Sequence, residues 1–267
     1  MPAVSTQATD DQPPARGALS GKVAVVVGGA SGIGRTASKA LARQGARVVV
    51  ADFDDARMER TVEEILGLGS SDAALALHTD VRNDNSVRSL ASDSVKAMGQ
   101  VDILLNMAGV LLRGPLDHIK PGDWKWMLDT NLLGPVRASL AFLPHMTERG
   151  SGHIINTVNA DALTPHDSLT IAYDTGQVAL ASFTRSLAAA LKGTGVNVSL
   201  YSIGSSGPRI GQNTRSRGLG RLLHPSEDLD EGTGGSDQLV DSLIEGLHNP
   251  RFEITAEPSA PVGGVAR

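Results

Sequence analysis

The sequence predicts a single α/β domain, built on a doubly wound parallel sheet with helices on both faces. Short apolar runs alternate with helical patterns along the whole chain, and the first run ends at glycines that open a helix. The runs also lack polar alternation, which is typical of strands buried on both faces of a parallel sheet. Strand–helix alternation of this kind favours right-handed crossovers.

The first half of the chain is predicted to hold four strands and three helices. Each strand is a short apolar run, rich in β-branched residues at the start of the chain, and the helices follow the runs. Gly45 marks the end of the first helix. The strands are expected at 22–28, 46–52, 73–79 and 101–105, and the helices at 35–44, 54–68 and 84–98.

The second half continues the alternation up to a segment without a period. Helices are expected at 124–148, 171–192 and 238–248, and strands at 153–158, 196–203 and 252–255. Residues 205–235 are rich in Gly, Ser, Arg and Asp, and we interpret them as a substrate lid. Residues 1–17 are small, polar and Pro-containing, so we expect a mobile tail there and a domain over 18–267.

Composition excludes several classes of protein. The net charge of −5 argues against a nucleic-acid partner, since phosphate contacts favour a basic face. No cysteine is present, which excludes disulfides, thiolate catalysis and cysteine-bound metals. The seven histidines are scattered, so we expect no metal site. We see no signal peptide or membrane helix and expect a cytoplasmic protein without a membrane partner.

Residues 28–34 read GGASGIG, directly between a predicted buried strand and a predicted helix. Gly28 permits a tight turn, Gly32 lets the backbone approach a pyrophosphate, and Gly34 allows close helix packing. The helix N-terminus, with Ser31 and Ile33, offers unpaired N–H groups to phosphates. This Rossmann-like arrangement predicts a dinucleotide site.

Asp52 ends the next predicted strand. A carboxylate there can accept both ribose hydroxyls of an adenosine and would repel a 2′-phosphate, so we predict NAD as the cofactor. Asp54 is more simply explained as a helix N-cap or a solvated turn residue. Arg35 can reach a phosphate, but an exposed helix position explains it equally well.

The spacing GxxxGxG, together with several motifs later in the chain, resembles the short-chain dehydrogenase/reductase family over residues 20–204. VGGASGIG at 27–34 is similar to the family's TGxxxGxG, with Val27 in place of threonine. The resemblance implies that Asp80 and Val81 hold the adenine ring. Further cofactor contacts are implied at Asn106, Ala108 and Gly109 of the NMAG segment, where Met107 replaces an asparagine, and at Gly204, which follows Ile203 where the family has proline.

The family's chemistry is a proton relay beside the nicotinamide. A tyrosine exchanges a proton with the substrate oxygen, a lysine four residues later lowers its pKa and holds the ribose, a serine hydrogen-bonds the substrate and an asparagine anchors a water. The resemblance implies Tyr173 and Asn131 for two of these roles. The serine position falls on Asn159 and the lysine position on Gln177.

These departures change the expected chemistry. A neutral glutamine amide cannot favour tyrosinate by charge, although Gln177 can hydrogen-bond ribose hydroxyls and Asn159 can donate to a carbonyl oxygen. Alcohol oxidation should suffer most, because neutral Tyr173 is already the proton donor that carbonyl reduction needs. We also expect that Gln177→Lys with Asn159→Ser would raise dehydrogenase activity.

Other polar residues are expected near the pocket. Asp161, His166, Asp167 and Asp174 lie between the strand 153–158 and Tyr173 or beside it, and a histidine paired with a carboxylate can act as a base. A solvated loop explains them equally well. The lid arginines could clamp an acidic substrate, or could belong to a mobile, solvated segment balanced by nearby acids; they are Arg209, Arg215, Arg217 and Arg221.

Three functions remain open from the sequence. The first is an NAD(H)-dependent oxidoreductase that acts on a small-molecule carbonyl or alcohol through an altered relay. The second is a non-redox isomerase, dehydratase or cyclase on the same scaffold, and the third is an inactive NAD-binding protein. The family commonly pairs two long helices between subunits, so the resemblance also implies a homodimer or homotetramer.

Overall fold

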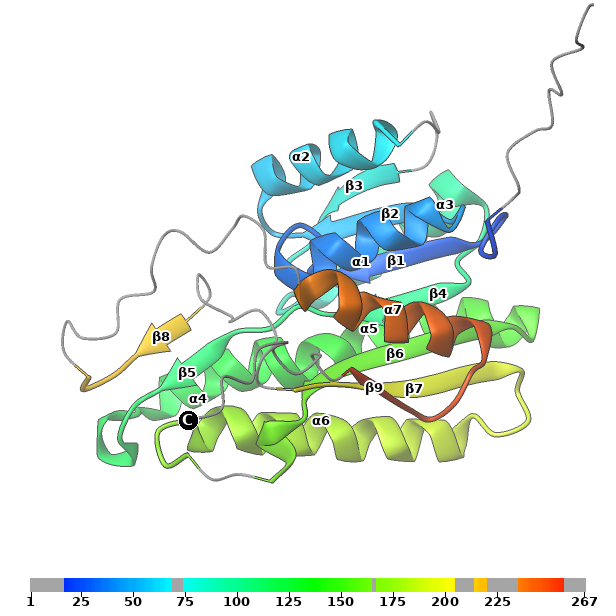
Figure 1. Cartoon of the computed structure of the whole chain (residues 1–267). Helices are drawn as coiled ribbons and strands as arrows, with labels where there is room; N and C mark the ends of the chain where they lie inside the picture. The colour runs from blue at the N-terminus through cyan, green and yellow to red at the C-terminus, as the bar shows by residue number, and fades with distance from the viewer. Residues whose placement is uncertain (1–16, 69–73, 165–166, 205–213, 220–234, 257–267) are drawn as a thin grey trace, which may run out of the picture.

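A sheet of seven parallel strands forms the centre of the molecule (Figure 1). The computed structural model describes residues 17–68, 74–164, 167–204, 214–219 and 235–256. In spatial order the strands are β3 (Ala74–His78), β2 (Arg47–Asp52), β1 (Val23–Val27), β4 (Ile103–Asn106), β6 (Gly152–Asn159), β7 (Val196–Ile203) and β9 (Glu253–Ala256). This order and direction confirm the predicted doubly wound parallel sheet.

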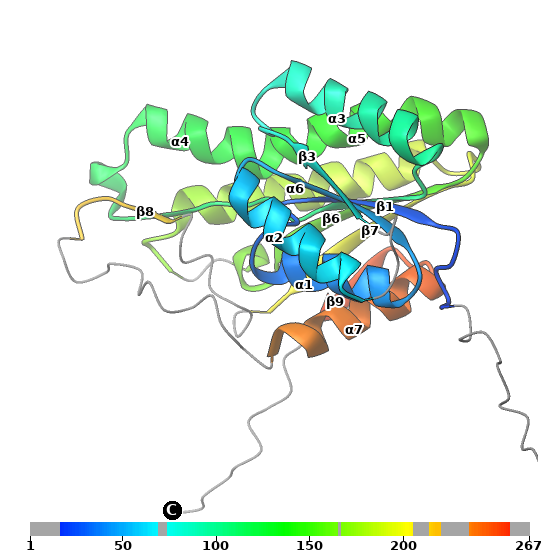
Figure 2. The same cartoon turned by 90° about the horizontal axis from the view of Figure 1, so that it is seen from above.

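Helices cover both faces of the sheet (Figure 2). One face carries α1 (Gly32–Arg43), α2 (Asp55–Leu66) and α7 (Gly235–His248), and the other carries α3 (Asp84–Met98), α5 (Gly134–Arg149) and α6 (Ile171–Ala190). A separate apolar core fills each layer, with Leu41 and Ile65 in the first and Phe142 and Met146 in the second. The all-apolar residues of β1 are buried on both faces, as a doubly covered strand requires.

The predicted helix 124–148 differs from the observed one. Helical structure begins earlier, in α4 (Pro121–Leu128), and passes through the π-helical segment η2 (Asp129–Leu133) before α5. A π turn carries one extra residue, which shifts the side chains that follow it around the helix axis. The spacing of apolar residues in the sequence does not indicate this π-helical segment.

A second, small sheet lies beside the main one. The three-residue strands β5 (Leu111–Arg113) and β8 (Thr214–Ser216) pair in parallel, although their residues are about a hundred positions apart. Sequence reasoning gave no strand at either place, because a run of three residues is too short to show a period. Among the described residues, no helix combines the length and the apolar character that crossing a bilayer requires.

Candidate active site

The candidate site lies at the carboxyl ends of the central strands. Val27 of β1 pairs with Ala51 of β2 on one side and with Asn106 of β4 on the other, and Asn106 pairs with Asn156 of β6. The chain order reverses between β1 and β4, and ligands of open parallel sheets bind outside the strand ends at such a switch point.

The turn between β1 and α1 is closely packed except at one place. Gly28 has φ +80°, and a Cβ there would lie 2.5 Å from the backbone nitrogen of Ala108. A Cβ on Gly34 would lie 2.0 Å from the carbonyl oxygen of Gly28. Gly32, at φ +49°, has no atom of the described residues within 4 Å of the place where its Cβ would lie. Two glycines therefore allow close packing of the chain, and the third borders open space.

The beginning of α1 can receive an anion. Its N-cap, Ser31, makes no side-chain capping hydrogen bond, and its first turn has no acidic residue. Helix N-termini present N–H groups and a partial positive charge. Arg35, in the same helix, instead forms an ion pair with Glu64 of α2, which Lys39 also contacts at 3.2 Å. In this structure Arg35 therefore contacts Glu64.

Asp52, the last residue of β2, is joined to the glycine turn. Its carboxylate accepts hydrogen bonds from the backbone N–H groups of Ala30 (3.2 Å), Phe53 (2.8 Å) and Asp54 (3.4 Å). Burial raises the pKa of Asp52 despite these three donors. A carboxylate has about four acceptor positions, so this group retains capacity for a sugar hydroxyl. Asp54 accepts from the N–H of Arg57 and caps α2, as expected.

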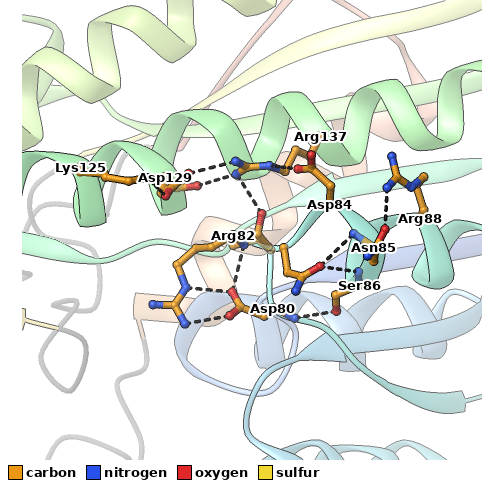
Figure 3. Close-up of polar contacts among 11 residues, drawn as sticks. Asp80, Arg82, Asp84, Asn85, Ser86, Arg88, Lys125, Asp129 and Arg137 are labelled. Atoms are coloured by element: carbon orange, nitrogen blue, oxygen red, sulfur yellow. Dashed lines mark hydrogen bonds and ion pairs between the residues drawn. The ribbon is translucent and has the colours of Figure 1, made fainter.

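The residues after β3 lie next to Asp52, since the N–H of Thr79 donates to the Asp52 carbonyl at 2.7 Å. Asp80 is held by Arg82, whose Nε and Nη2 each donate to one carboxylate oxygen at 2.8 Å (Figure 3). The guanidinium lowers the pKa of Asp80. Val81 is buried against Gly134, where an added Cβ would lie 3.1 Å away.

The NMAG segment, which begins at the last residue of β4, lies against the glycine turn. The N–H of Met107 donates to Val27, and Ala108 lies against Gly28. Asn106 is buried and donates through Nδ2 to Oδ1 of Asn156 at 2.8 Å, while its own Oδ1 has no partner among the residues described. A direct contact between Asn106 and a cofactor stays a prediction. Its observed contact links neighbouring strands.

Asn131 lies in the middle of η2 and is buried. Its amide closes a ring with the backbone of Val110: Oδ1 accepts from the Val110 N–H at 2.8 Å, and Nδ2 donates to the Val110 carbonyl at 2.7 Å. Gly109 lies beside this ring. The side chain of Asn131 therefore fixes the loop after β4.

Tyr173, Asn159 and Gln177 come together at the start of α6. The side chain of Asn159 hydrogen-bonds the Tyr173 hydroxyl. Asn159 Oδ1 also accepts from the N–H of Asp161 at 2.9 Å. Gln177 Oε1 accepts from the backbone N–H of Asn159 at 2.8 Å. Burial raises the pKa of Tyr173, and the hydrogen bond from Asn159 offsets part of that effect.

The polar residues near Tyr173 have separate partners. Asp167 receives Arg113 Nη2 at 3.2 Å, and Asp174 receives the Thr170 hydroxyl at 2.8 Å. The Oδ2 atom of Asp161 is buried and has no partner within the part of the chain that the structure describes. His166 lies outside the described residues, so its role as a base stays a prediction.

Two of the 205–235 arginines, Arg215 and Arg217, are described; both are exposed, and both also have partners in the fold. Arg217 makes a forked ion pair with the buried carboxylate of Asp123 in α4, and its N–H donates to the Arg113 carbonyl. The guanidinium of Arg215 lies 3.7 Å from the ring centre of Trp126. Both contacts hold β8 on α4. Arg209, Arg221 and the nearby acids lie outside the described residues, and Gly204 donates its N–H to Ala256.

Sequence reasoning missed several residues that build the site. Asn156 supports Asn106, Asp123 holds Arg217, and Arg137 of α5 joins three segments beside Asn131. The spacing of Asp129 and Arg137, about two helical turns, was an available signal for one face of a helix. The other partners are far apart in the chain and left no local signal.

Comparison with known proteins agrees with this geometry. Residues 22–217 match the family model described as short chain dehydrogenase. A short chain dehydrogenase of Pseudocercospora fijiensis is 32% identical over 249 residues, 92% of this chain and 75% of the relative. An uncharacterized oxidoreductase of Staphylococcus saprophyticus is 33% identical, over 90% of this chain and 98% of the relative.

Two solved structures are similar to this fold and differ in their cofactors. A short chain dehydrogenase/reductase from Burkholderia phymatum, in complex with NAD, has a TM-score of 0.78 and 26% identity, covering 90% of each chain. A metagenomic short-chain oxidoreductase in complex with NADP has a TM-score of 0.74 and 27% identity, covering 91% of this chain and 99% of its own. These similarities leave the choice between NAD and NADP to the residues.

Proposed function

This chain belongs to the short chain dehydrogenase family, and we propose that it is an NAD(H)-dependent oxidoreductase that reduces the carbonyl group of a small molecule. The observation that carries the proposal is the placement of Tyr173, which is buried in the first turn of α6, with Asn159 and Gln177 joined beside it by a hydrogen bond. Burial raises the pKa of its hydroxyl, so the group is protonated near neutral pH. A protonated tyrosine is a proton donor, so this site favours reduction over oxidation.

The chain's own residues supply the proton. When bound, a reduced nicotinamide would supply the hydride that the carbonyl carbon accepts. The O–H bond of Tyr173 then breaks and a new O–H bond forms on the substrate oxygen, which gives an alcohol. The resulting tyrosinate is stabilised by the Asn159 amide and takes a proton from solvent.

Gln177 has a different role from that of the lysine that the resemblance implies at this position. Its Oε1 receives the backbone N–H of Asn159, which is the residue that contacts Tyr173. We therefore propose that Gln177 positions Asn159, and through it the tyrosine hydroxyl. Without an ammonium group at 177, the anion of Tyr173 gains no stabilisation by charge from that position, and alcohol oxidation is slow near neutral pH.

The residues present fit a dinucleotide. The open space at Gly32 and the uncapped N-terminus of α1 suit a pyrophosphate. Asp52 has acceptor capacity for a ribose hydroxyl, and its negative charge disfavours a 2′-phosphate. Arg35 and Lys39, the nearby cations of α1, contact Glu64. These features support NAD over NADP.

A direct assay tests this proposal. The purified protein is mixed with NADH or NADPH and a panel of ketones and aldehydes, and loss of reduced-nicotinamide absorbance is followed. We expect turnover with NADH, weaker turnover with NADPH, and a fall of about 10²–10⁴ in kcat for Tyr173→Phe. Tyr201→Phe is the matched control, because its buried hydroxyl donates to the Leu239 carbonyl within the core.

Two results would contradict the proposal. Equal turnover by Tyr173→Phe would remove the tyrosine from the reaction. NADH binding without any carbonyl turnover would favour a non-redox or purely binding role on this scaffold.

A further inference from the structure

Arg137 of α5 joins three segments that are distant in sequence (Figure 3). Its Nε donates to Asp84 at the start of α3 at 2.5 Å, and its Nη2 donates to Asp129 Oδ1 at 2.9 Å. Its Nη1 lies within hydrogen-bond distance of two backbone carbonyls, those of Val81 (3.2 Å) and Asp129 (3.3 Å). One planar side chain therefore connects the turn after β3, the beginning of α3 and the first residue of η2.

This junction is well fixed. The side chains of Arg137 and Asp129 are only 21% and 16% exposed, and Lys125 adds a second cation to Asp129 at 2.9 Å. Hydrogen bonds from Lys125 and Arg137 lower the pKa of Asp129, so its charge persists well below neutral pH. A guanidinium fork with several acceptors has a defined geometry that a flexible ammonium lacks.

A second contact connects the same two places. Val81 packs on Gly134, the residue directly after η2, and a Cβ on Gly134 would lie 3.1 Å from the Val81 side chain. A displacement of the turn at residues 80–82 would therefore change two contacts with η2. The packing of Val81 on Gly134 would move the end of η2, and the hydrogen bonds of Arg137 to Val81 and Asp129 would move its beginning. Asn131 lies between these two points, and its amide is closed on the backbone of Val110.

We propose that Arg137 is a positioning residue that couples the turn at residues 80–82 to Asn131 and, through Asn131, to the backbone of Val110. The inference rests on the proposed function in one respect: it requires that the dinucleotide binds, with its adenine against this turn, which is the place that the family resemblance implies for Asp80 and Val81. Binding there then fixes Asn131 and Val110 as well. One arginine thus links the adenosine end of the cofactor site to the end where the chemistry occurs.

Hydrogen exchange tests the coupling without requiring catalysis. The readout is the exchange rate of the Val110 N–H, which donates to Asn131. In the wild type we expect NAD⁺ or ADP to slow this exchange several-fold. In Arg137→Met we expect exchange about tenfold faster without ligand, and little further effect of ligand. Arg88→Met is the control, because Arg88 is exposed and donates to Asn85 of its own helix (Figure 3).

Kinetics separate positioning from general destabilisation. Arg137→Met should raise KM for NADH and lower kcat, each about tenfold, whereas Arg137→Met added to Asn131→Ala should lower kcat no further than Asn131→Ala alone. Additive effects on kcat would overturn the coupling. So would a melting temperature that falls while Val110 exchange stays at the wild-type rate.

The two proposals fail in different ways. If the protein binds NAD⁺ but reduces no carbonyl, the proposed function fails and the exchange experiment still decides the coupling. If NAD⁺ and ADP do not bind, the ligand-dependent part of the coupling is overturned together with the cofactor assignment.

Discussion

At the scale of single residues, the side-chain amides near Tyr173 have roles that their positions in the family's motif do not suggest. Gln177 accepts a hydrogen bond from the N–H of Asn159, and the side chain of Asn159 interacts with the Tyr173 hydroxyl. A lysine at position 177 has three donors and no acceptor, so it cannot receive that N–H. The expectation that Gln177→Lys with Asn159→Ser would raise dehydrogenase activity therefore meets a structural obstacle.

We predict that Gln177→Lys lowers the free energy of unfolding by about 1–3 kcal/mol, the usual cost of a buried donor left without a partner. Urea denaturation at neutral pH measures this change. Thr175→Lys introduces the same side chain at an exposed position of α6 and should change stability by less than about 0.5 kcal/mol. Equal stability of the two variants would mean that the N–H of Asn159 does not depend on Gln177.

At the scale of elements, the turn from β1 to α1 shows that glycines in one motif serve different purposes. Gly34 is needed for packing, because any Cβ there meets the Gly28 carbonyl. Gly32 borders open space, so its small size matters for what binds there. The two roles can be separated by the same substitution at each position.

We predict that Gly34→Ala is destabilising by several kcal/mol or prevents folding, since a backbone contact of 2.0 Å forces the chain to move. Gly32→Ala should fold, with a cost of about 1–2 kcal/mol for its left-handed conformation. Its affinity for NADH should fall at least tenfold, because the methyl group fills the space of the pyrophosphate. Urea denaturation and calorimetric titration measure the two effects, and normal NADH affinity in Gly32→Ala would place the dinucleotide elsewhere.

At the scale of the whole molecule, stability in acid depends on a residue far from the site. His153 of β6 is buried, and its Nε2 lies 2.7 Å from the Ser199 hydroxyl of β7. Burial lowers the pKa of His153 to about 4. The folded state thus keeps this ring neutral at pH values where the unfolded chain protonates it. Protonation of the unfolded chain therefore lowers the free energy of unfolding as the pH falls from about 6.5 toward 4, and above about pH 6.5 this loss is absent.

We predict that His153 accounts for about 2–3 kcal/mol of the stability lost between pH 7 and pH 4.5. His153→Gln keeps a donor for Ser199 and removes the titrating group, so its unfolding free energy should fall less over this range. Denaturant titrations at several pH values measure the difference. His118→Gln, at an exposed position, is the control and should follow the wild-type curve. If the unfolding free energy of His153→Gln falls with pH as steeply as that of the wild type, the assignment to His153 is contradicted.

Assembly is also a property of the whole molecule. Exposed apolar side chains lie on the path of η2 and α5 at Leu133 and Leu140, and on α6 at Val178. Family resemblance implies that such helices pair between subunits, and we propose a homodimer or homotetramer on this basis. The exposed apolar residues give this proposal a target for mutation.

We predict that Leu140→Glu combined with Val178→Glu converts the oligomer to a folded monomer, because two charges would become buried in the contact. Size-exclusion chromatography with light scattering measures the mass. Leu68→Glu, at an exposed position after α2, should leave the mass unchanged. A double variant with the wild-type mass would exclude these helices as the interface.

The strands of the main sheet, their parallel arrangement and the glycine turn with its acid could be predicted from the sequence, whereas the short strands β5 and β8 and the π-helical segment η2 could not. The predicted features depend on short runs of residues: the valines of β1, the spacing of Gly28, Gly32 and Gly34, and Asp52 at a strand end. Burial on both faces and backbone conformation act locally, so they leave a pattern that can be read along the chain.

The contacts between polar groups, by contrast, became visible only in the folded molecule. Asn159 and Gln177 are 18 residues apart, Arg137 and Asp84 are 53 apart, and Arg217 and Asp123 are 94 apart. A hydrogen bond depends on distance and direction in space, and many polar residues along a chain can satisfy the same donor. The packed arrangement of sheet and helices selects one of them, and with it the roles of Gln177 and Arg137.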